Sequence, residues 1–344
     1  MLKLRITNMT PHRQPTRRTL IIINNVAARA RRVWHALRDK IQEANIAFDL
    51  HETTHPGDAE IKTRAALRAG YDTVAIVGGD GTLSEAASGF FNLDDEKFSA
   101  AKDFQHCPLP QSVNPSAALA LLPAGTGDDF ARGLAKRRAP LDEWLQKFIL
   151  HCRGQGATRA VDCLYGTTDD GAHKFICLNA ATLGLGAQVA MRVGNQGRMI
   201  RGLPGEARFA LAATIALARW RERIVRVTVD ESETLECKSN LLAVANGLYA
   251  GGGMMLAPDA QLDDGLLDVL LTRNLSRPEL LRELARVHRG GHIANPKVRS
   301  LRGSRVCIET INPADKLPLE ADGNVRGFTP TEFRVMPGAM RVVC

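Results

Sequence analysis

The stretch VGGDGTLSEAASG, residues 77–89, places glycines at positions 78, 79, 81 and 89, directly after the apolar run 74–77. Glycine is costly in ordered structure and is kept where the backbone adopts unusual dihedral angles or approaches another group closely. The apolar run predicts a buried strand over 73–77, and the apolar spacing after the glycines predicts a helix over 83–91. We therefore expect a strand, a glycine-rich turn and a helix in direct succession.

Alternating strands and helices surround this unit and define a first domain over residues 19–140. The apolar patterns predict strands at 20–23, 46–50 and 117–122 and helices at 27–44 and 58–68, and a further helix at 141–151 follows the boundary near residue 140. Such alternation is typical of an α/β fold with a parallel sheet and helices on both of its faces. The polar stretch 94–115 has the composition of a loop insertion, and residues 1–18 have that of a loose extension.

The second half of the chain consists mostly of short apolar runs, a pattern that predicts a β-sandwich domain over residues 141–327. Turn signals such as Asp-Gly at 264–265 and 322–323 separate short apolar runs. Helical patterns interrupt them at 204–221 and 278–289. The predicted strands are 174–181, 224–229, 241–245, 266–271, 305–309 and 332–335.

Composition narrows the class of protein. The 344 residues are 44% hydrophobic and 24% charged, which is ordinary for a globular protein, and no apolar run approaches the roughly 20 residues of a membrane span. Seven cysteines without a C-x-x-C pair indicate reduced thiols in a cytoplasmic protein. The net charge of +8 suggests an anionic partner, while only 5% aromatic residues and no recognition motif argue against nucleic acid.

A second glycine turn repeats the layout of the first. Residues 121–134, LLPAGTGDDFARGL, run from an apolar strand through Gly125-Thr126-Gly127 into a helix. Main-chain N–H groups at helix starts bind phosphate, so two such turns at neighbouring strand ends can hold one triphosphate from two sides. Asp80 would then reach the phosphate through Mg²⁺ or its waters. The alternative is a pair of tight turns that bind nothing.

Four motifs, in order, resemble the diacylglycerol kinase catalytic-domain family, which includes bacterial lipid kinases, sphingosine kinases and ceramide kinases. They are GGDGT followed by Glu85, P-x-GTG-x-DFAR, the segment NGLYAGGGMMLAPDAQLDDGLLDV at 246–269, and PLEADGN at 318–324. The resemblance covers residues 19–340. It implies a nucleotide-binding α/β domain, a β-sandwich, an active cleft between them, and a last segment, 328–344, that returns to the first domain.

The resemblance also implies roles for particular residues. Asp322 matches the general base that accepts the proton of the lipid hydroxyl. Gln261, Asp264 and Leu266 match a second, structural Mg²⁺ site. The alternatives are plain turns at 264–265 and 322–323, and an ordinary loop residue at Thr53. The positions that match ATP contacts are Thr53, Gly78, Gly79, Asp80, Gly81, Thr82, Leu83, Ser84 and Thr126.

The chain departs from the family pattern at several points. The Asn-Pro turn after the first strand reads NNVAA at 24–28, Asp128 stands where the family has a neutral asparagine, and Asn324 replaces a glutamate after Asp322-Gly323. We expect these changes to affect nucleotide affinity and catalytic efficiency more than the fold. The apolar 204–221 helix either covers the sandwich core or belongs to an acyl-chain-binding region.

The resulting hypothesis is a cytoplasmic, peripherally membrane-associated lipid kinase that uses ATP and Mg²⁺. Its substrate is diacylglycerol or a related long-chain alcohol such as a sphingoid base, and a homodimer is left open. The basic stretch 273–305 either contacts anionic lipid or is a solvated surface. Two alternatives are an NAD-kinase-like phosphotransferase with a soluble substrate, and a nucleotide- or lipid-binding regulator with impaired catalysis, which Asp128 and Asn324 favour.

Overall fold

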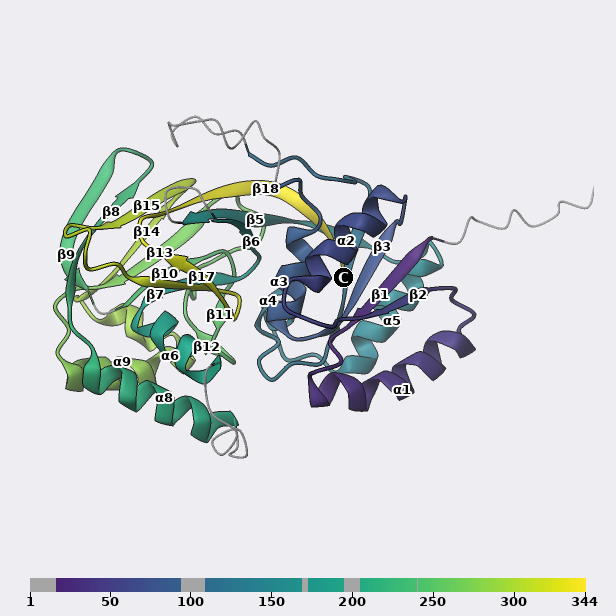
Figure 1. The fold of residues 1–344 in the computed structure, drawn as a ribbon, viewed down its shortest axis with the longest axis horizontal. Helices are drawn as coiled ribbons and strands as arrows, with labels where there is room; N and C mark the ends of the chain where they lie inside the picture. Colours follow the sequence, from purple (N-terminus) through teal and green to yellow (C-terminus); the bar gives the residue numbers. More distant parts are fainter. Residues whose placement is uncertain (1–16, 94–108, 169–172, 195–204, 240) are drawn as a thin grey trace, which may run out of the picture.

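The computed structural model describes residues 17–93, 109–168, 173–194, 205–239 and 241–344. Expectations about 1–16, 94–108 and residue 204 lie outside this range. Figure 1 shows two lobes: an α/β lobe, on the right, and a lobe made mostly of strands, on the left. The predicted fold class, a parallel-sheet α/β domain joined to an antiparallel sandwich, is confirmed.

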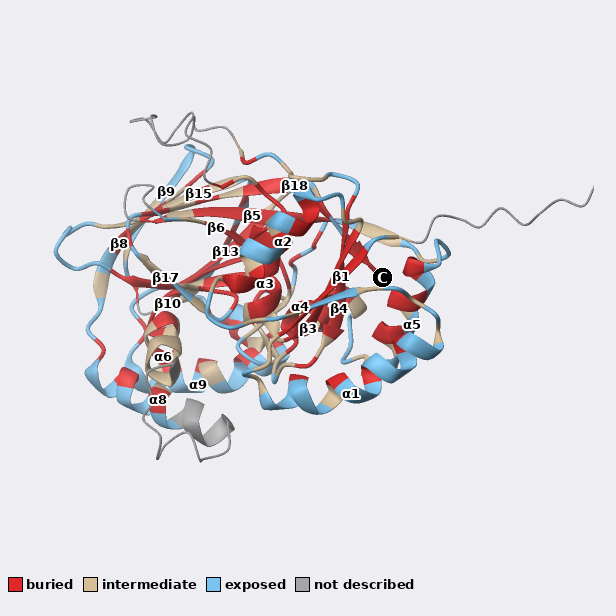
Figure 2. Ribbon diagram, turned by 45° about the vertical axis from the view of Figure 1, so that its right-hand side comes forward, coloured by how far each residue is buried: buried red, intermediate tan, exposed pale blue. Residues whose placement is uncertain are grey.

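The α/β lobe is built on four parallel strands in the order β2-β1-β3-β4. Strands β1 (Thr19–Ile23), β3 (Thr73–Gly78) and β4 (Ala118–Pro123) are buried almost throughout, which is why they read as continuous apolar runs (Figure 2). Helices α2 and α3 cover one face and α1 and α5 the other (Figure 1). The remaining elements are β2 (Asp49–Glu52), α1 (Ala28–Glu43), α2 (Asp58–Arg68), α3 (Asp80–Ser88), α4 (Asp129–Ala135) and α5 (Leu141–Cys152).

Two elements in this lobe begin three residues away from their predicted starts. Strand β2 begins at residue 49 rather than 46, because Asn45 adopts φ 56° and the Ile46 N–H donates to the Ile41 carbonyl, which closes α1. Helix α3 begins at Asp80 rather than 83, because Gly79 already serves as its N-cap. The first turn of α3 therefore consists of residues that the sequence pattern assigned to the glycine-rich turn.

The sandwich lobe packs two sheets face to face. One sheet continues from β4 in the order β4-β18-β15-β8-β9, with β5 and β6 added beside β18, and the other has the order β14-β13-β10-β7-β16-β17. Leu164, Leu183, Val244 and Phe333 belong to the core between these sheets. The strands are β5 (Thr158–Thr168), β6 (His173–Cys177), β7 (Ala180–Gly184), β8 (Arg223–Val229), β9 (Glu233–Ser239), β10 (Leu241–Ala245), β13 (Leu267–Thr272), β14 (Val298–Gly303), β15 (Arg305–Thr310), β16 (Pro318–Ala321), β17 (Asn324–Phe328) and β18 (Thr331–Val343).

Helices lie below this lobe in Figure 1, and a small hairpin faces the α/β lobe. The expected 278–289 helix is α9 (Arg277–Arg286) followed by a 3₁₀ turn (Val287–Arg289). None of the described helices combines the length and the hydropathy needed to cross a membrane. The other elements are α6 (Leu185–Gly194), α8 (Gly205–Arg219), β11 (Tyr249–Ala250) and β12 (Met254–Met255).

The last strand connects the two lobes. Strand β18 pairs antiparallel with β5 and β15, and beyond an irregularity between Met336 and Met340 it pairs parallel with β4 through Arg341 and Val342. The predicted strand 332–335 is only the first part of it. One strand shared by both lobes makes their larger sheet continuous, and this constrains how the lobes sit relative to each other.

The predicted strand 174–181 is wrong as a single element. The chain breaks at Leu178 and Asn179, so that β6 belongs to one sheet and β7 to the other. The main-chain N–H groups at this break donate to a carboxylate from a distant part of the sequence, and the apolar pattern carries no sign of that partner.

Buried His151 predicts an acid-sensitive fold. It is 1% exposed and its Nε2 lies 3.0 Å from the Thr73 hydroxyl. Burial, with Arg17 and Arg341 nearby, lowers the pKa of His151 to about 4. The folded state therefore binds fewer protons than the unfolded state, so stability is complete above pH 6.5 and falls as the pH drops towards 4. We expect a loss of about 2 kcal/mol in urea unfolding between pH 7.5 and pH 5.

The His151→Gln variant retains a hydrogen-bonding group beside Thr73 but cannot titrate. Between pH 7.5 and pH 5, the unfolding free energy of this variant should fall by about 2 kcal/mol less than that of the native chain. Equal pH dependence in the two proteins would contradict the assignment.

Candidate active site

The residues matched to ATP contacts lie at the carboxyl ends of the parallel strands. Thr53 follows β2 and its N–H donates to the Ile23 carbonyl at 2.9 Å, while the Ala124 N–H, after β4, donates to the Gly78 carbonyl at 2.8 Å. Asn24, after β1, donates to the Thr82 hydroxyl at 2.9 Å. Open parallel sheets bind their ligands at this edge.

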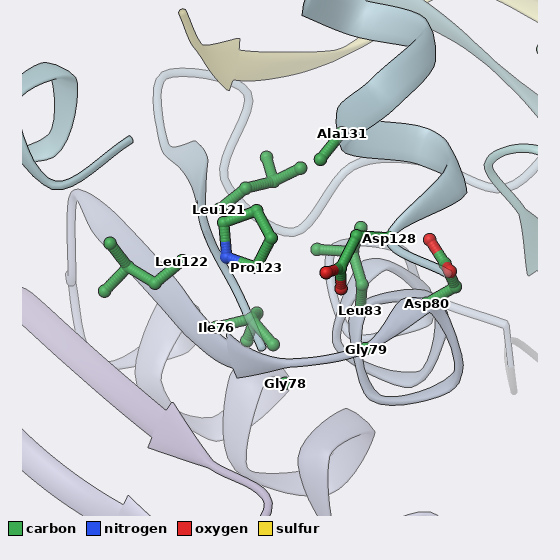
Figure 3. Close-up of a pocket in the computed structure, with 10 residues that line it drawn as sticks. All are labelled: Ile76, Gly78, Gly79, Asp80, Leu83, Leu121, Leu122, Pro123, Asp128 and Ala131. Atoms are coloured by element: carbon green, nitrogen blue, oxygen red, sulfur yellow. The ribbon is translucent and has the colours of Figure 1, made fainter. Parts of the chain in front are cut away.

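The two glycine turns touch each other. A Cβ atom built on Gly79 would lie 3.1 Å from the Gly125 Cα, and one built on Gly125 would lie 2.5 Å from the Gly79 Cα. Two backbones can approach this closely only without side chains. Figure 3 shows the small pocket beside this contact, with the carboxylates of Asp80 and Asp128 close to Gly79.

Asp80 caps the neighbouring helix. Its two carboxylate oxygens accept hydrogen bonds from the Asp129 and Phe130 N–H groups, at 3.0 and 3.1 Å. These amides open α4 and have no partner within the helix. The first glycine-rich motif therefore orients the helix that follows the second one.

Asp129 continues the connection into the sandwich lobe. Its Oδ2 accepts from the Gly252 N–H at 2.7 Å, and its Oδ1 has no hydrogen-bond partner among the described residues. Burial and the nearby Asp80 raise the pKa of Asp129 to about 6. Glycines 251–253 all adopt positive φ, and a Cβ on Gly253 would collide with the Arg132 guanidinium. The GGG motif thus allows the loop to close over α4.

Asp322 lies at the turn between β16 and β17 and is 7% exposed. Its carboxylate accepts the N–H groups of Leu178, Asn179 and Ala180 at 2.7, 3.0 and 3.1 Å. Burial raises the pKa of Asp322, and the amides of Leu178 and Ala180 oppose that shift. The main-chain N–H groups at the break between β6 and β7 therefore bind this carboxylate.

The turn that carries Asp322 rests on the first turn of α3. The Asn324 side chain donates to the Gly81 carbonyl at 3.1 Å, and a Cβ on Gly81 would lie 3.6 Å from the Asp322 carbonyl oxygen. The structure thus brings together the segment 78–84 and Asp322, which are more than two hundred residues apart in sequence. Thr126 lies exposed on the second glycine turn, beside this cluster.

A second carboxylate, that of Glu320 on β16, lies beside the same turn and was not predicted as a site residue. Glu320 accepts the Gly323 N–H and, at 2.8 Å, the Thr182 hydroxyl. Desolvation raises the pKa of Glu320 to about 7. An acidic residue two positions before Asp322 was the available signal.

Positive charge surrounds Asp128, the unusual residue of the second turn. Its Oδ1 accepts the Gly125 N–H at 2.7 Å, and Arg29 on α1 lies 3.6 Å from its Oδ2 and also donates to the Gly125 carbonyl. Arg138 donates to the Thr126 carbonyl at 3.3 Å. Neither arginine was predicted as a site residue, although the basic run at 136–138 is visible in the sequence. Asp128 also takes φ 51°, which aspartate and asparagine tolerate best among residues other than glycine.

The loop that carries Thr53 is held by neighbouring carboxylates. Asp58 accepts the Thr54 N–H at 2.8 Å and contacts His51 at 3.1 Å; its pKa falls to about 2 because these hydrogen bonds outweigh desolvation. Glu85, which follows the GGDGT motif, accepts a hydrogen bond from the Gly57 backbone. Thr53 therefore lies on a loop that α3 helps to position.

The three residues matched to a structural metal lie before and at the start of β13. Gln261 is exposed, and the Asp264 Oδ1 accepts the Leu266 N–H at 3.0 Å. The other Asp264 oxygen contacts the Arg302 guanidinium. Within the described residues there is no group of three or more His, Cys, Asp or Glu side chains arranged for a metal ion.

Comparisons with known proteins agree with this geometry. The diacylglycerol kinase catalytic domain matches residues 18–164, and the YegS C-terminal NAD kinase β-sandwich-like domain matches residues 179–344. Diacylglycerol kinase of Mycobacterium tuberculosis is 27% identical over 288 residues, 83% of this chain and 81% of that protein. A relative from Xanthomonas euvesicatoria, named as a YegS-like lipid kinase, is 30% identical over 306 residues, 88% of each chain.

A solved structure supports the fold over the whole length. The crystal structure of a diacylglycerol kinase from Bacillus anthracis has a TM-score of 0.62 at 17% identity, covering 96% of this chain and 97% of that one. Glycine turns at the ends of parallel strands, opposite a carboxylate from a sandwich, define a two-domain kinase. The chain belongs to the diacylglycerol kinase family and is a lipid kinase.

The Asp80 cap of α4 can be tested by substitution. Asp80→Ala leaves the Asp129 and Phe130 amides without their acceptor, so we expect a loss of about 1–2 kcal/mol in unfolding free energy. Hydrogen exchange of α4 should accelerate in the same variant. Asp39→Asn, on the exposed face of α1, is the control and should change neither quantity. Unchanged protection of α4 in Asp80→Ala would refute the capping role.

Proposed function

We propose that this lipid kinase transfers the γ-phosphate of ATP to the hydroxyl of diacylglycerol or a related long-chain alcohol such as a sphingoid base. The observation that carries the proposal is the contact of the Asp322 turn with Gly81. This contact sets a buried carboxylate against the turns whose main-chain N–H groups suit phosphate. A proton acceptor beside a phosphate site is what phosphoryl transfer to an alcohol requires.

The nucleotide half of the proposal rests on the two glycine turns. Main-chain N–H groups of 78–82 and 126–127, with the hydroxyls of Thr53 and Thr126, bind the triphosphate. Arg29 and Arg138 offset the charge of Asp128, whose pKa burial raises. Asp80 and Asp128 offer carboxylate oxygens in the pocket, which suit Mg²⁺ carried by the phosphates with retained waters (Figure 3). The ion would neutralise charge that develops on the transferred group.

The acceptor half rests on Asp322. Three main-chain N–H groups hold its carboxylate in one orientation, and the Glu320 side chain fixes the turn through the Gly323 N–H. Asp322 accepts the proton of the lipid hydroxyl as the oxygen attacks the γ-phosphate. A preorganised base of this kind needs no rearrangement of its own turn.

Removing this carboxylate tests the mechanism. Asp322→Asn should lower the rate of transfer from labelled ATP to diacylglycerol or sphingosine at least 100-fold, because a positioned base contributes about 10²–10⁴. ATP with Mg²⁺ should still raise the melting temperature of the variant. Asp315→Asn, at an exposed position, serves as the matched control and should retain activity.

The same assay decides between the candidate functions. Labelling of NAD in preference to lipid would support a soluble-substrate phosphotransferase. A thermal shift with ATP but no labelled product from any lipid alcohol would support a regulator without catalysis. Full activity of Asp322→Asn would remove Asp322 as the base.

We also propose peripheral contact with an anionic membrane through α8 and α9, which lie together below the sandwich in Figure 1. Leu281 on α9 is 56% exposed, and Leu211 and Ile215 on α8 are also exposed. Arg282, Arg286 and Arg289 accompany them. Apolar side chains beside arginines suit the surface of a bilayer, where each basic residue contributes about 1 kcal/mol. Other α8 residues, Ala212 and Ala216, pack into the core.

Vesicle binding tests this surface. Full-length protein should co-sediment with phosphatidylglycerol vesicles, and the double change Leu281→Asp with Arg289→Glu should weaken binding at least tenfold. Leu150→Asp, on an exposed position of α5, should bind as the native chain does. Equal binding of all three proteins, or equal binding to neutral vesicles, would contradict the proposed surface.

A further inference from the structure

A single guanidinium lies among three carboxylates beside the loop 259–266. The Asp264 Oδ2 contacts the Arg302 Nη2, and the Asp268 Oδ1 lies 3.2 Å from the Arg302 Nε. The antiparallel register of β13 and β14 sets Asp268 directly opposite Arg302. Asp259 is close enough to interact electrostatically with both. This cluster lies on the loop where the family resemblance implies a structural Mg²⁺.

The burial of these groups favours a counter-charge beside them. The Asp268 side chain is 4% exposed and that of Asp264 is 19% exposed, whereas Arg302 keeps 38% of its side chain in solvent. A buried carboxylate without a counter-charge is strongly destabilising. Arg302 offers a planar group whose N–H donors reach both carboxylates at once, which a guanidinium does better than a point charge.

Both Asp264 oxygens already have partners within the protein. Its Oδ1 accepts the Leu266 N–H across the turn, and its Oδ2 contacts Arg302. Mg²⁺ needs oxygen ligands at about 2.1 Å in octahedral geometry, and the positive guanidinium would repel an ion at Asp264. Gln261, the first of the expected ligands, is exposed. The donor set that is present does not fit the expected ion.

Protein groups already perform the task of anchoring this turn. Asp162, which is 1% exposed, accepts the Gly265 N–H with one oxygen and the Gly338 N–H with the other, each at 2.7 Å. The Asp162 N–H donates to the Leu262 carbonyl at 2.7 Å. Asp162 therefore connects the loop to β5 and β18, and Arg302 on β14 neutralises the charge of its carboxylates.

We propose that Arg302 takes the place of the structural Mg²⁺ in this chain, so that the turn formed by Gln261, Asp264 and Leu266 needs no metal. The arginine is a cation that the protein always carries. The fold of the sandwich lobe is then independent of Mg²⁺ concentration, in contrast to nucleotide binding at the other site.

The test uses the full chain without ATP or lipid, so its outcome does not depend on the proposed function. The melting temperature of the native chain should be the same within 1 °C in EDTA and in millimolar Mg²⁺. Arg302→Met keeps much of the side-chain volume but removes the cation, so it should melt lower in EDTA and recover part of the loss in Mg²⁺. Arg299→Met, on the exposed face of the same strand, should show neither effect.

Direct binding of Mn²⁺ in place of Mg²⁺ gives a second measurement. Electron paramagnetic resonance should show the same amount of bound Mn²⁺ on the native chain and on Asp264→Asn. The Arg302→Met variant should bind one additional Mn²⁺ ion. The proposal is overturned if EDTA lowers the melting temperature of the native chain, or if native protein binds an ion that Asp264→Asn releases. If Arg302→Met does not fold, the comparison of native protein with Asp264→Asn decides the matter alone.

Discussion

Carboxylates that accept main-chain N–H groups hold the glycine-rich turns and the Asp322 turn of this kinase in place. Asp80 binds the amides that open α4, Asp129 on α4 binds the glycine loop at 252, and Asp322 binds the amides at the break between β6 and β7. Each of these bonds is charge-assisted and about twice as strong as a neutral one. Two of them join segments from different lobes or different sheets. The glycine-rich turns are therefore structural junctions as well as candidate phosphate sites.

The glycines and the carboxylates depend on each other. Gly79 and Gly125 allow two backbones to touch, and Gly253 makes room for Arg132. The turns are packed closely, so only a short side chain fits between them. An aspartate is short and can still accept hydrogen bonds from the neighbouring amides. The charge of Asp80 contributes to the raised pKa values of Asp128 and Asp129. The cations of the nucleotide complex would relieve this repulsion, which links ligand binding to the order of the cleft.

The departures from the family pattern have neighbours that compensate for them. Asp128 replaces a neutral side chain, and Arg29 lies 3.6 Å from it. Asn324 lacks the usual carboxylate, yet its amide reaches Gly81 and Glu320 supplies a carboxylate to the same turn. Arg302 stands where a metal ion was expected. In each case a residue from a separate element provides a charged partner near the altered position.

The sequence by itself determined the fold class, the glycine-rich turns and the family. Apolar runs, glycine pairs and motif order depend on residues a few positions apart, and these local patterns predicted the parallel sheet, the sandwich and most of the candidate site. They did not predict the break at 178–179, the α4 cap on Asp80, or the roles of Arg29, Glu320 and Arg302. Those features depend on contacts between segments more than twenty residues apart in most cases. Only the packed tertiary structure decided them, because hydrogen bonds and charge pairs across a fold leave no periodic signal in the chain.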